Sequence, residues 1–249
     1  IGNDAFKEVE IIGITRPCTK HNFLVKDVKD LAETVRKAFY LARSGRPGPL
    51  LVDIPKNIQQ ASCEFVWPED VVMRSYCPTF RANLNQLRRA MDVLVTSRKP
   101  LIVAGGGVIM ANAAEELCTL AHLMHAPVCS TLMGLGAFPG DDPLWIGMLG
   151  MHGTFAANRA VTQADVILAV GARFDDRVTG KLSQFAPNAR IVHIDIDPTT
   201  LRKNVRVEVP VVSDALSALQ GLRSILESGH AQKDWAGDHA DWMGQVLEW

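Results

Sequence analysis

Small, hydroxyl-bearing and charged residues follow each of five short apolar runs in this 249-residue chain. In chain order they are Gly105-Gly106-Gly107, Thr131 to Gly134, Gly171 to Arg177, Asp195 to Asp197, and Ser213-Asp214. Glycines let a ligand approach the backbone closely, arginines bind phosphate, and carboxylates accept hydrogen bonds from ribose hydroxyls. These are the residue types that a dinucleotide requires. We therefore predict a nucleotide site, provided that all five runs end at one edge of a sheet.

The apolar runs have the composition of buried parallel strands, and amphipathic segments alternate with them. Strands are predicted at 101–104, 127–129, 166–170, 191–194 and 209–212, and helices at 84–97, 112–125, 155–163 and 214–227. Such alternation is typical of an α/β fold, here a doubly wound, mainly parallel sheet with helices on both faces. Ligands of such sheets bind beyond the carboxyl ends of the strands, where the strand order reverses. The five runs would therefore converge.

The segments on either side of this region differ from it. Residues 27–43 have the apolar spacing of a helix, which the Ser44–Pro49 turn ends, and residues 50–55 form a predicted strand. One helix and one strand are too few for a domain, so residues 1–60 are interpreted as a remnant of another α/β domain. Residues 61–80 have no period and are interpreted as a linker. The last stretch, 229–249, has three tryptophans seven residues apart, typical of a helix face that needs a partner.

Each signal also has a structural interpretation. The three glycines do not form a GxGxxG motif and could make a tight turn. Asp195 could cap the turn that follows it, and Arg173 and Arg177 could pair with the neighbouring aspartates. The Gly147–Gly153 segment, which holds His152, could be a plain loop. Agreement among five loops favours the nucleotide site.

Other kinds of site are less well supported. His122 and His125 lie three residues apart on a predicted helix, as metal ligands can. No cysteine or carboxylate at ligand spacing accompanies them, so we predict no metal site. A hydrolase triad has no starting point, because the sequence contains no G-x-S-x-G motif.

Composition excludes several partners. The 26 basic and 27 acidic residues give a net charge of −1, which favours neither nucleic acid nor an anionic membrane surface. No apolar run is long enough to span a bilayer, and the first ten residues are not a signal peptide.

The first residue is not Met, which suggests a start within a longer protein. Five cysteines without a CxxC pair indicate a reducing compartment, the cytoplasm or one such as a plastid.

Several short sequences, in order along residues 1–228, carry a family likeness. They are Gly2-x-Asp4-Ala5-Phe6, Thr19-Lys20-His21-Asn22, Ser44-Gly45-Arg46-Pro47-Gly48-Pro49, Asp53-Ile54-Pro55-Lys56, Ser130-Thr131-Leu132-Met133-Gly134, Gly150-Met151-His152-Gly153, Arg173-Phe174-Asp175-Asp176-Arg177-Val178-Thr179-Gly180 and His193-Ile194-Asp195-Ile196-Asp197. Together they resemble the catalytic (large) subunit of acetohydroxyacid synthase, or acetolactate synthase.

The resemblance implies a reaction and three cofactors. This family condenses two 2-keto acids, pyruvate with pyruvate or with 2-ketobutyrate, with decarboxylation, in branched-chain amino-acid biosynthesis. Its first domain carries a glutamate that activates thiamine diphosphate, its middle domain binds FAD without net redox change, and its third holds Mg²⁺ and the diphosphate through a GDG motif. The resemblance also implies a homo-oligomer, with a possible small regulatory subunit.

By the same resemblance, residues 1–60 are the C-terminal part of the N-terminal, pyrimidine-binding domain and 61–80 a linker. Residues 81–228 are the FAD-binding domain, and 229–249 lead toward a C-terminal thiamine-diphosphate domain. The sequence contains no GDG motif and no segment for the activating glutamate. The chain alone is therefore expected to be inactive.

The resemblance also implies which residues form the site, through the motifs that match. The implied FAD-binding residues are Arg46, Gly105, Gly106, Gly107, Thr131, Leu132, Gly150, Met151, His152, Gly171, Ala172, Arg173, Asp175, Arg177, Val178, Asp195, Ile196, Asp214 and Ala215. The implied catalytic set is Arg177, which binds the carboxylate of the second substrate, with Phe6, Lys56 and Met151; Phe6 and Lys56 match residues of the substrate channel. Lys7 departs from the family, which has Gln there.

The sequence alone leaves two other hypotheses open. The chain could be a nucleotide-binding or regulatory module without catalysis. It could also belong to another thiamine-diphosphate carboligase or to a related oxidase.

Overall fold

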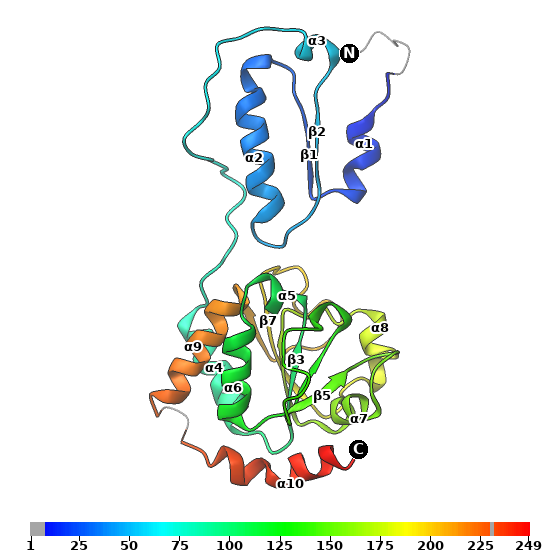
Figure 1. Ribbon diagram of the computed structural model, residues 1–249, viewed down its shortest axis with the longest axis vertical. Helices are drawn as coiled ribbons and strands as arrows, with labels where there is room; N and C mark the ends of the chain where they lie inside the picture. Colours follow the sequence, from blue (N-terminus) through cyan, green and yellow to red (C-terminus); the bar gives the residue numbers. More distant parts are fainter. Residues whose placement is uncertain (1–7, 230–231) are drawn as a thin grey trace. The chain divides into compact units, whose positions relative to one another are not determined.

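The structure, a computed structural model, describes residues 8–229 and 232–249. The chain divides into two compact units, Ile1–Pro78 and Thr79–Trp249, each of which is described by itself (Figure 1). The boundary falls within the irregular segment after residue 60. The assignment of the two units to particular domains of a larger subunit stays a prediction.

The first unit is built around two parallel strands, β1 (His21–Leu24) and β2 (Leu50–Asp53), paired from His21↔Leu50 to Leu24↔Asp53. The helices α1 (Ile11–Thr15) and α2 (Leu31–Arg43) lie on opposite sides of this pair, and α3 (Lys56–Gln59) follows β2 (Figure 1). We expected one strand here. β1 was missed because its sequence, HNFL, has no apolar alternation and no member of it is fully buried.

The second unit contains a six-stranded, all-parallel sheet in the order β5-β4-β3-β6-β7-β8. The strands are β3 (Pro100–Ala104), β4 (Val128–Ser130), β5 (Trp145–Met148), β6 (Val166–Val170), β7 (Arg190–Asp195) and β8 (Val209–Val212). The predicted α/β class and parallel sheet are confirmed. β5 is additional: Gly147, at φ +95°, interrupts its apolar run, and its residues are mostly half-buried at the sheet edge.

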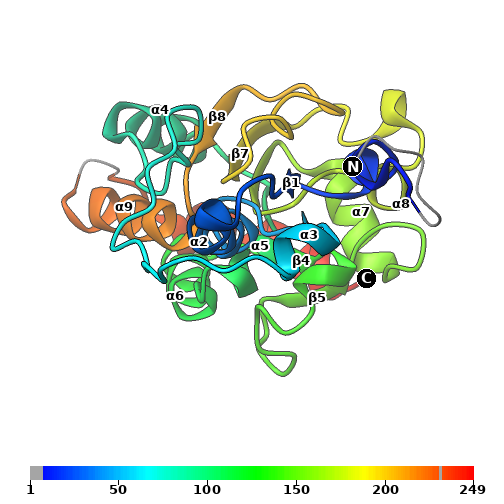
Figure 2. The same ribbon diagram turned by 90° about the horizontal axis from the view of Figure 1, so that it is seen from above.

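Helices cover both faces of this sheet (Figures 1 and 2). On one face lie α4 (Leu84–Val95), α5 (Gly106–Met110), α6 (Ala114–Met124) and α9 (Ala215–Glu227); on the other lies α7 (Phe155–Gln163), with the short α8 (Asp176–Thr179) nearby. Alternate residues of each buried strand serve the two faces. Ile102 and Leu168 belong to the first core, whereas Val103 and Ile167 belong to the second.

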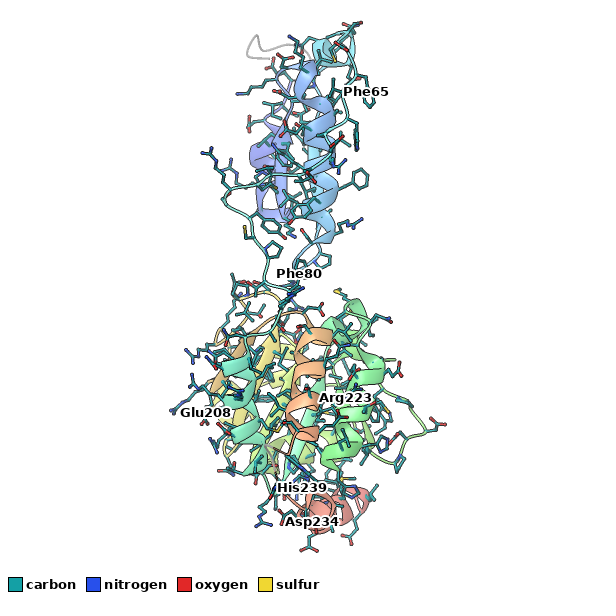
Figure 3. The ribbon with its side chains drawn as sticks, turned by 90° about the vertical axis from the view of Figure 1, so that its left-hand side faces the viewer. Phe65, Phe80, Glu208, Arg223, Asp234 and His239 are labelled. Atoms are coloured by element: carbon teal, nitrogen blue, oxygen red, sulfur yellow. The ribbon has the colours of Figure 1, made fainter. Side chains whose placement is uncertain are left out.

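The helix α10 (Trp235–Leu247) closes the end of the second unit where the strands begin. The indole Nε1–H of Trp242 donates to the Pro100 carbonyl at 2.8 Å, and Nδ1–H of buried His239 donates to the Met124 carbonyl at 2.8 Å. Figure 3 labels His239 at this end and Phe80 at the opposite end of the unit. The tryptophan spacing thus marked a helix, and its partner surface is this unit itself.

A buried ammonium group also holds α10 in place. Nζ of Lys233 donates to the carbonyl of Val95, the last residue of α4 (3.1 Å), and to that of Ser97, two residues further on, and it lies 3.0 Å from Nε2 of His239. Burial lowers the pKa of Lys233, and burial together with the Lys233 charge lowers the pKa of His239. The ring is therefore neutral at neutral pH. Within the described residues, no helix has the length and apolar character needed to cross a membrane.

Candidate functional site

The strand order reverses between β3 and β6. From β3 the chain moves outward through β4 to β5, and it then returns to the other side of β3 for β6, β7 and β8. β3 and β6 are paired over five residues, from Pro100↔Val166 to Ala104↔Val170. The loops that begin at Gly105 and Gly171 therefore leave the sheet side by side, at the place where open α/β sheets bind ligands.

Glycines alone allow these loops to come so close. A Cβ atom on Gly105 would lie 2.0 Å from the carbonyl oxygen of Gly171, and one on Gly107 would lie 2.7 Å from the Gly171 Cα. The Gly107 N–H donates to the Gly171 carbonyl at 3.2 Å, and Gly171 has φ +59°. Backbone atoms, and not side chains, therefore fill the space between these two loops. We call Gly105, Gly107, Gly134 and Gly171 the glycine cradle.

The loop after β4 completes the cradle. A Cβ atom on Gly134 would lie 2.2 Å from the carbonyl oxygen of Ala104, and the Thr131 N–H donates to that same oxygen at 3.0 Å. Beyond buried Thr131, the side chains of Leu132 and Met133 are 68% and 66% exposed. The edge thus presents apolar side chains next to bare backbone.

A buried histidine orders the loop after β6. Nε2–H of His193, on β7, donates to the Ala172 carbonyl at 2.7 Å, and its ring meets Phe174 edge to face at 5.1 Å. Phe174 is buried with φ +53°, a conformation that non-glycine residues rarely adopt. Burial lowers the pKa of His193 to about 4, so the ring is neutral near pH 7. Among the described residues, its Nδ1 is a buried atom without a hydrogen-bond partner.

The loop after β5 lies against α8. The Met151 N–H donates to the Arg177 carbonyl at 2.8 Å, and a Cβ atom on Gly150 would lie 2.4 Å from that oxygen. The Asn158 side chain brackets Gly150, accepting from its N–H at 2.9 Å and donating to its carbonyl at 3.0 Å. Three predicted site residues, Met151, His152 and Arg177, are thus brought together with exposed side chains.

The two arginines of this region each lie near an aspartate. Arg173 lies 3.3 Å from Asp175, and Arg177 lies 3.8 Å from Asp176; all four side chains are at least 40% exposed. Ion pairs in water at such distances are weak. Both guanidinium groups can therefore exchange these partners for an anionic ligand at little cost.

The carboxylates that were predicted to bind a nucleotide accept hydrogen bonds from nearby backbone N–H groups. Oδ1 of Asp195 accepts from the Asp197 N–H at 2.8 Å, and Oδ1 of Asp214 accepts from the N–H of Leu216 at 2.9 Å at the start of α9. Asp175 likewise caps α8 through the Val178 N–H at 3.2 Å. The capping interpretation offered for Asp195 is therefore correct, and the caps made by Asp175 and Asp214 are further findings of the structure. A role toward a nucleotide stays a prediction for all three.

Two predicted site residues belong to the first unit, where Arg46 and Lys56 are exposed. Phe6, like Lys7, lies outside the described residues. The turn that carries Arg46 is tightly held. Nζ of Lys20 binds the carbonyls of Leu41 (2.5 Å) and Ser44 (2.6 Å) at the end of α2, where a cation is favoured, and the hydroxyl of Tyr76 at 2.9 Å.

We expect Tyr76→Phe to loosen this turn by about 1–2 kcal/mol. The variant keeps the ring on Tyr40 but loses the hydroxyl that donates to Ser44 (2.9 Å) and accepts from Lys20. Hydrogen exchange followed by mass spectrometry should show faster exchange at the Gly48 N–H, which now donates to Ala42. Tyr40→Phe, in the same ring pair, should leave that rate unchanged; equal rates in all three proteins would contradict this account.

Some residues of the site were not predicted as such. Gly134 stood in a quoted motif, but only its distance from Ala104 shows why it must be glycine. Buried Ser130, whose Oγ has no hydrogen-bond partner among the described residues, ends β4 beside Thr131. Nothing in the sequence marks Asn158, because this residue of α7 bonds to the backbone of Gly150, in the loop after β5.

Residues 87–222 match the family described as "Thiamine pyrophosphate enzyme, central domain". This range is more than half of the chain and contains all six strands of the large sheet. The chain belongs to this family. The four glycines of the cradle also lie within the matched range.

Similarity to individual proteins extends along the whole chain. The acetolactate synthase isozyme 3 large subunit of Escherichia coli (strain K12) is 46% identical over 253 residues, covering 100% of this chain and 44% of that protein. The probable acetolactate synthase large subunit of Methanocaldococcus jannaschii is 48% identical, covering 100% and 42%. The chain is thus homologous to acetolactate synthase large subunits, which confirms the resemblance, and it spans less than half the length of these relatives.

Proposed function

We propose that this chain is part of an acetolactate synthase large subunit and that its second unit binds FAD at the glycine cradle. The observation that carries the proposal is the backbone-only approach of the β3, β4 and β6 loops at the strand-order reversal. The 46% identity to an acetolactate synthase large subunit along the whole chain supports the choice of reaction, the condensation of two 2-keto acids with decarboxylation.

The residues at the cradle suit the parts of FAD. Bare backbone at Gly105–Gly107 would approach the phosphates, and the exposed Arg173 guanidinium would bind them. The carboxylates of Asp195 and Asp214 would accept hydrogen bonds from hydroxyls of the adenosine half. Leu132, Met133 and Met151, exposed and apolar, would contact the flavin ring.

The flavin, when bound, would contribute no net redox change, as the resemblance implies. The protein's own residues would do the positioning. His193 fixes the Ala172 carbonyl and so the direction in which Arg173 leaves the sheet. Arg177, exposed on α8, would bind the carboxylate of the second keto acid through its planar guanidinium group.

Other roles require more than these residues. Thiamine diphosphate and Mg²⁺, implied by the family, would serve the full subunit. Arg46 and Lys56 would contribute from the first unit. A homo-oligomer, a small regulatory subunit and a cytoplasmic or plastid location complete the proposal.

FAD titrated into the chain should quench flavin fluorescence to a saturating 1:1 endpoint. Arg173→Gln should weaken binding about tenfold or more, because a charge-assisted hydrogen bond contributes roughly 1.5–3 kcal/mol. Arg98→Gln is a matched control: it removes the same charge from an exposed ion pair with Asp238 near α10 and should bind FAD normally. Equal affinity in both variants, or no saturable binding by the unaltered chain, would contradict the proposal.

A further inference from the structure

A thiol, an imidazole and a carboxylate meet on the outside of α6. Cys118 and His122 lie one turn apart on this helix, so their side chains share one face. Asp142 comes from the turn between Pro139 and Leu144 that precedes β5. Sγ of Cys118, a ring nitrogen of His122 and a carboxylate oxygen of Asp142 all lie within 4.8 Å of one another.

The carboxylate is held in position by its own turn. Its Oδ1 accepts from the Leu144 N–H at 2.9 Å, and its backbone carbonyl accepts from the Trp145 N–H at 2.9 Å. Prolines 139 and 143 restrict the backbone on both sides. Oδ2 therefore points at α6, 2.8 Å from Nε2 of His122, and the Asp142 side chain is only 12% exposed.

We propose that Cys118, His122 and Asp142 form a binding site for one zinc-class divalent ion. Thiolate, imidazole and carboxylate are the three ligand types of protein zinc, at bond lengths of about 2.3, 2.0 and 2.1 Å respectively. Ligand atoms already within 4.8 Å of one another need to move little to reach these distances. His122, whose side chain is 51% exposed, is free to make that adjustment.

Three protein ligands leave a fourth tetrahedral position open to water. The ion would clamp α6 to the turn before β5. A soft thiolate selects zinc, cobalt or copper over magnesium, so this site is distinct in chemistry from a magnesium-diphosphate site.

The location also separates this site from the proposed nucleotide site. The Asp142 turn leads into the start of β5, and α6 leads into the start of β4. The cluster therefore lies toward the amino ends of the strands, whereas the glycine cradle lies at their carboxyl ends. Loss of either function need not affect the other.

The sequence suggested a different pair of candidate metal ligands. We predicted no metal site because His122 and His125 lacked a cysteine or carboxylate partner at ligand spacing. The structure gives His122 both partners, Cys118 on its own helix and Asp142 twenty residues away in sequence. His125 is not in the cluster; it ends α6 in the left-handed conformation, with φ +47°.

Cobalt titration tests the proposal. Three exposed cysteines, Cys18, Cys63 and Cys77, are first replaced by serine in the full chain, so that Cys118 is the only thiol that is not fully buried. Co²⁺ should then give a thiolate-to-cobalt charge-transfer band with a 1:1 endpoint. Zn²⁺ should abolish this band and raise the melting temperature, whereas a large excess of Mg²⁺ should not abolish it.

Single variants identify the ligands. Cys118→Ser should eliminate the band, and His122→Gln and Asp142→Asn should each weaken Co²⁺ binding at least tenfold. Asp142→Asn keeps Oδ1 for the Leu144 N–H, and circular dichroism checks that each variant is folded. His125→Gln is the control and should bind normally. The absence of a band in the parent, or unchanged binding in Cys118→Ser, would overturn the proposal.

Discussion

Gly105→Ala is expected to destabilise the second unit by about 2 kcal/mol or more and to reduce FAD affinity more than tenfold. Its Cβ would lie 2.0 Å from the Gly171 carbonyl oxygen and 2.7 Å from the Ala172 Cα, both backbone atoms of the loop that directly follows β6. Backbone hydrogen bonds hold this loop, from the Gly107 N–H to the Gly171 carbonyl and from the Gly171 N–H to the Ile194 carbonyl. Overpacking of a well-packed interior costs roughly 1–3 kcal/mol, and here no flexible side chain can yield.

Gly244→Ala provides the control for this prediction. Gly244 is within α10, and a Cβ atom there would meet nothing within 4 Å. Alanine in a helix interior is favoured over glycine by about 0.5–1 kcal/mol, so this variant should be slightly more stable and should bind FAD normally. Urea unfolding and flavin titration measure both quantities. If Gly105→Ala unfolded at the same urea concentration as the parent, the cradle could not be as tight as described.

Continuous apolar runs made most of the large sheet predictable. The strands 166–170 and 209–212 have the predicted bounds, because buried parallel strands are apolar on both faces. β1 and β5 lack that signature: the first is a polar strand of a two-stranded sheet, and the second is an edge strand interrupted by glycine. Their pairing depends on neighbours distant in sequence, which local pattern does not encode.

The position of the candidate site was predictable from the sequence, but its atomic contacts were not. Convergence of the glycine, threonine and arginine loops follows from parallel strands ending at one edge, and these loops do lie there. What the sequence could not give is which backbone atoms meet. The contacts of His193 with Ala172, of Asn158 with Gly150 and of Asp142 with His122 each join a loop to a helix or strand, between residues 8 to 21 apart in sequence. Such contacts depend on the fold rather than on spacing.

Between about pH 7 and pH 4, we expect the second unit to lose about 3 kcal/mol of stability through His193 alone. Burial holds the pKa of the folded ring at about 4, against 6.5 in the unfolded chain. In this range the unfolded state binds a proton that the folded state does not, so the free energy of unfolding falls as the pH falls. Above about pH 7 this contribution is complete and constant. The lowered pKa of His239 acts in the same direction.

Urea unfolding at a series of pH values measures this loss, and one variant assigns it. His193→Gln keeps an N–H donor for the Ala172 carbonyl but cannot be protonated. The slope of its unfolding free energy against pH should therefore be smaller than that of the parent, by the contribution of up to one proton. It should also be less stable at pH 7, since the ring contact with Phe174 is lost. His152→Gln, the same substitution at an exposed histidine, serves as the control. An unaltered slope in His193→Gln would show that this ring does not cause the loss of stability in acid.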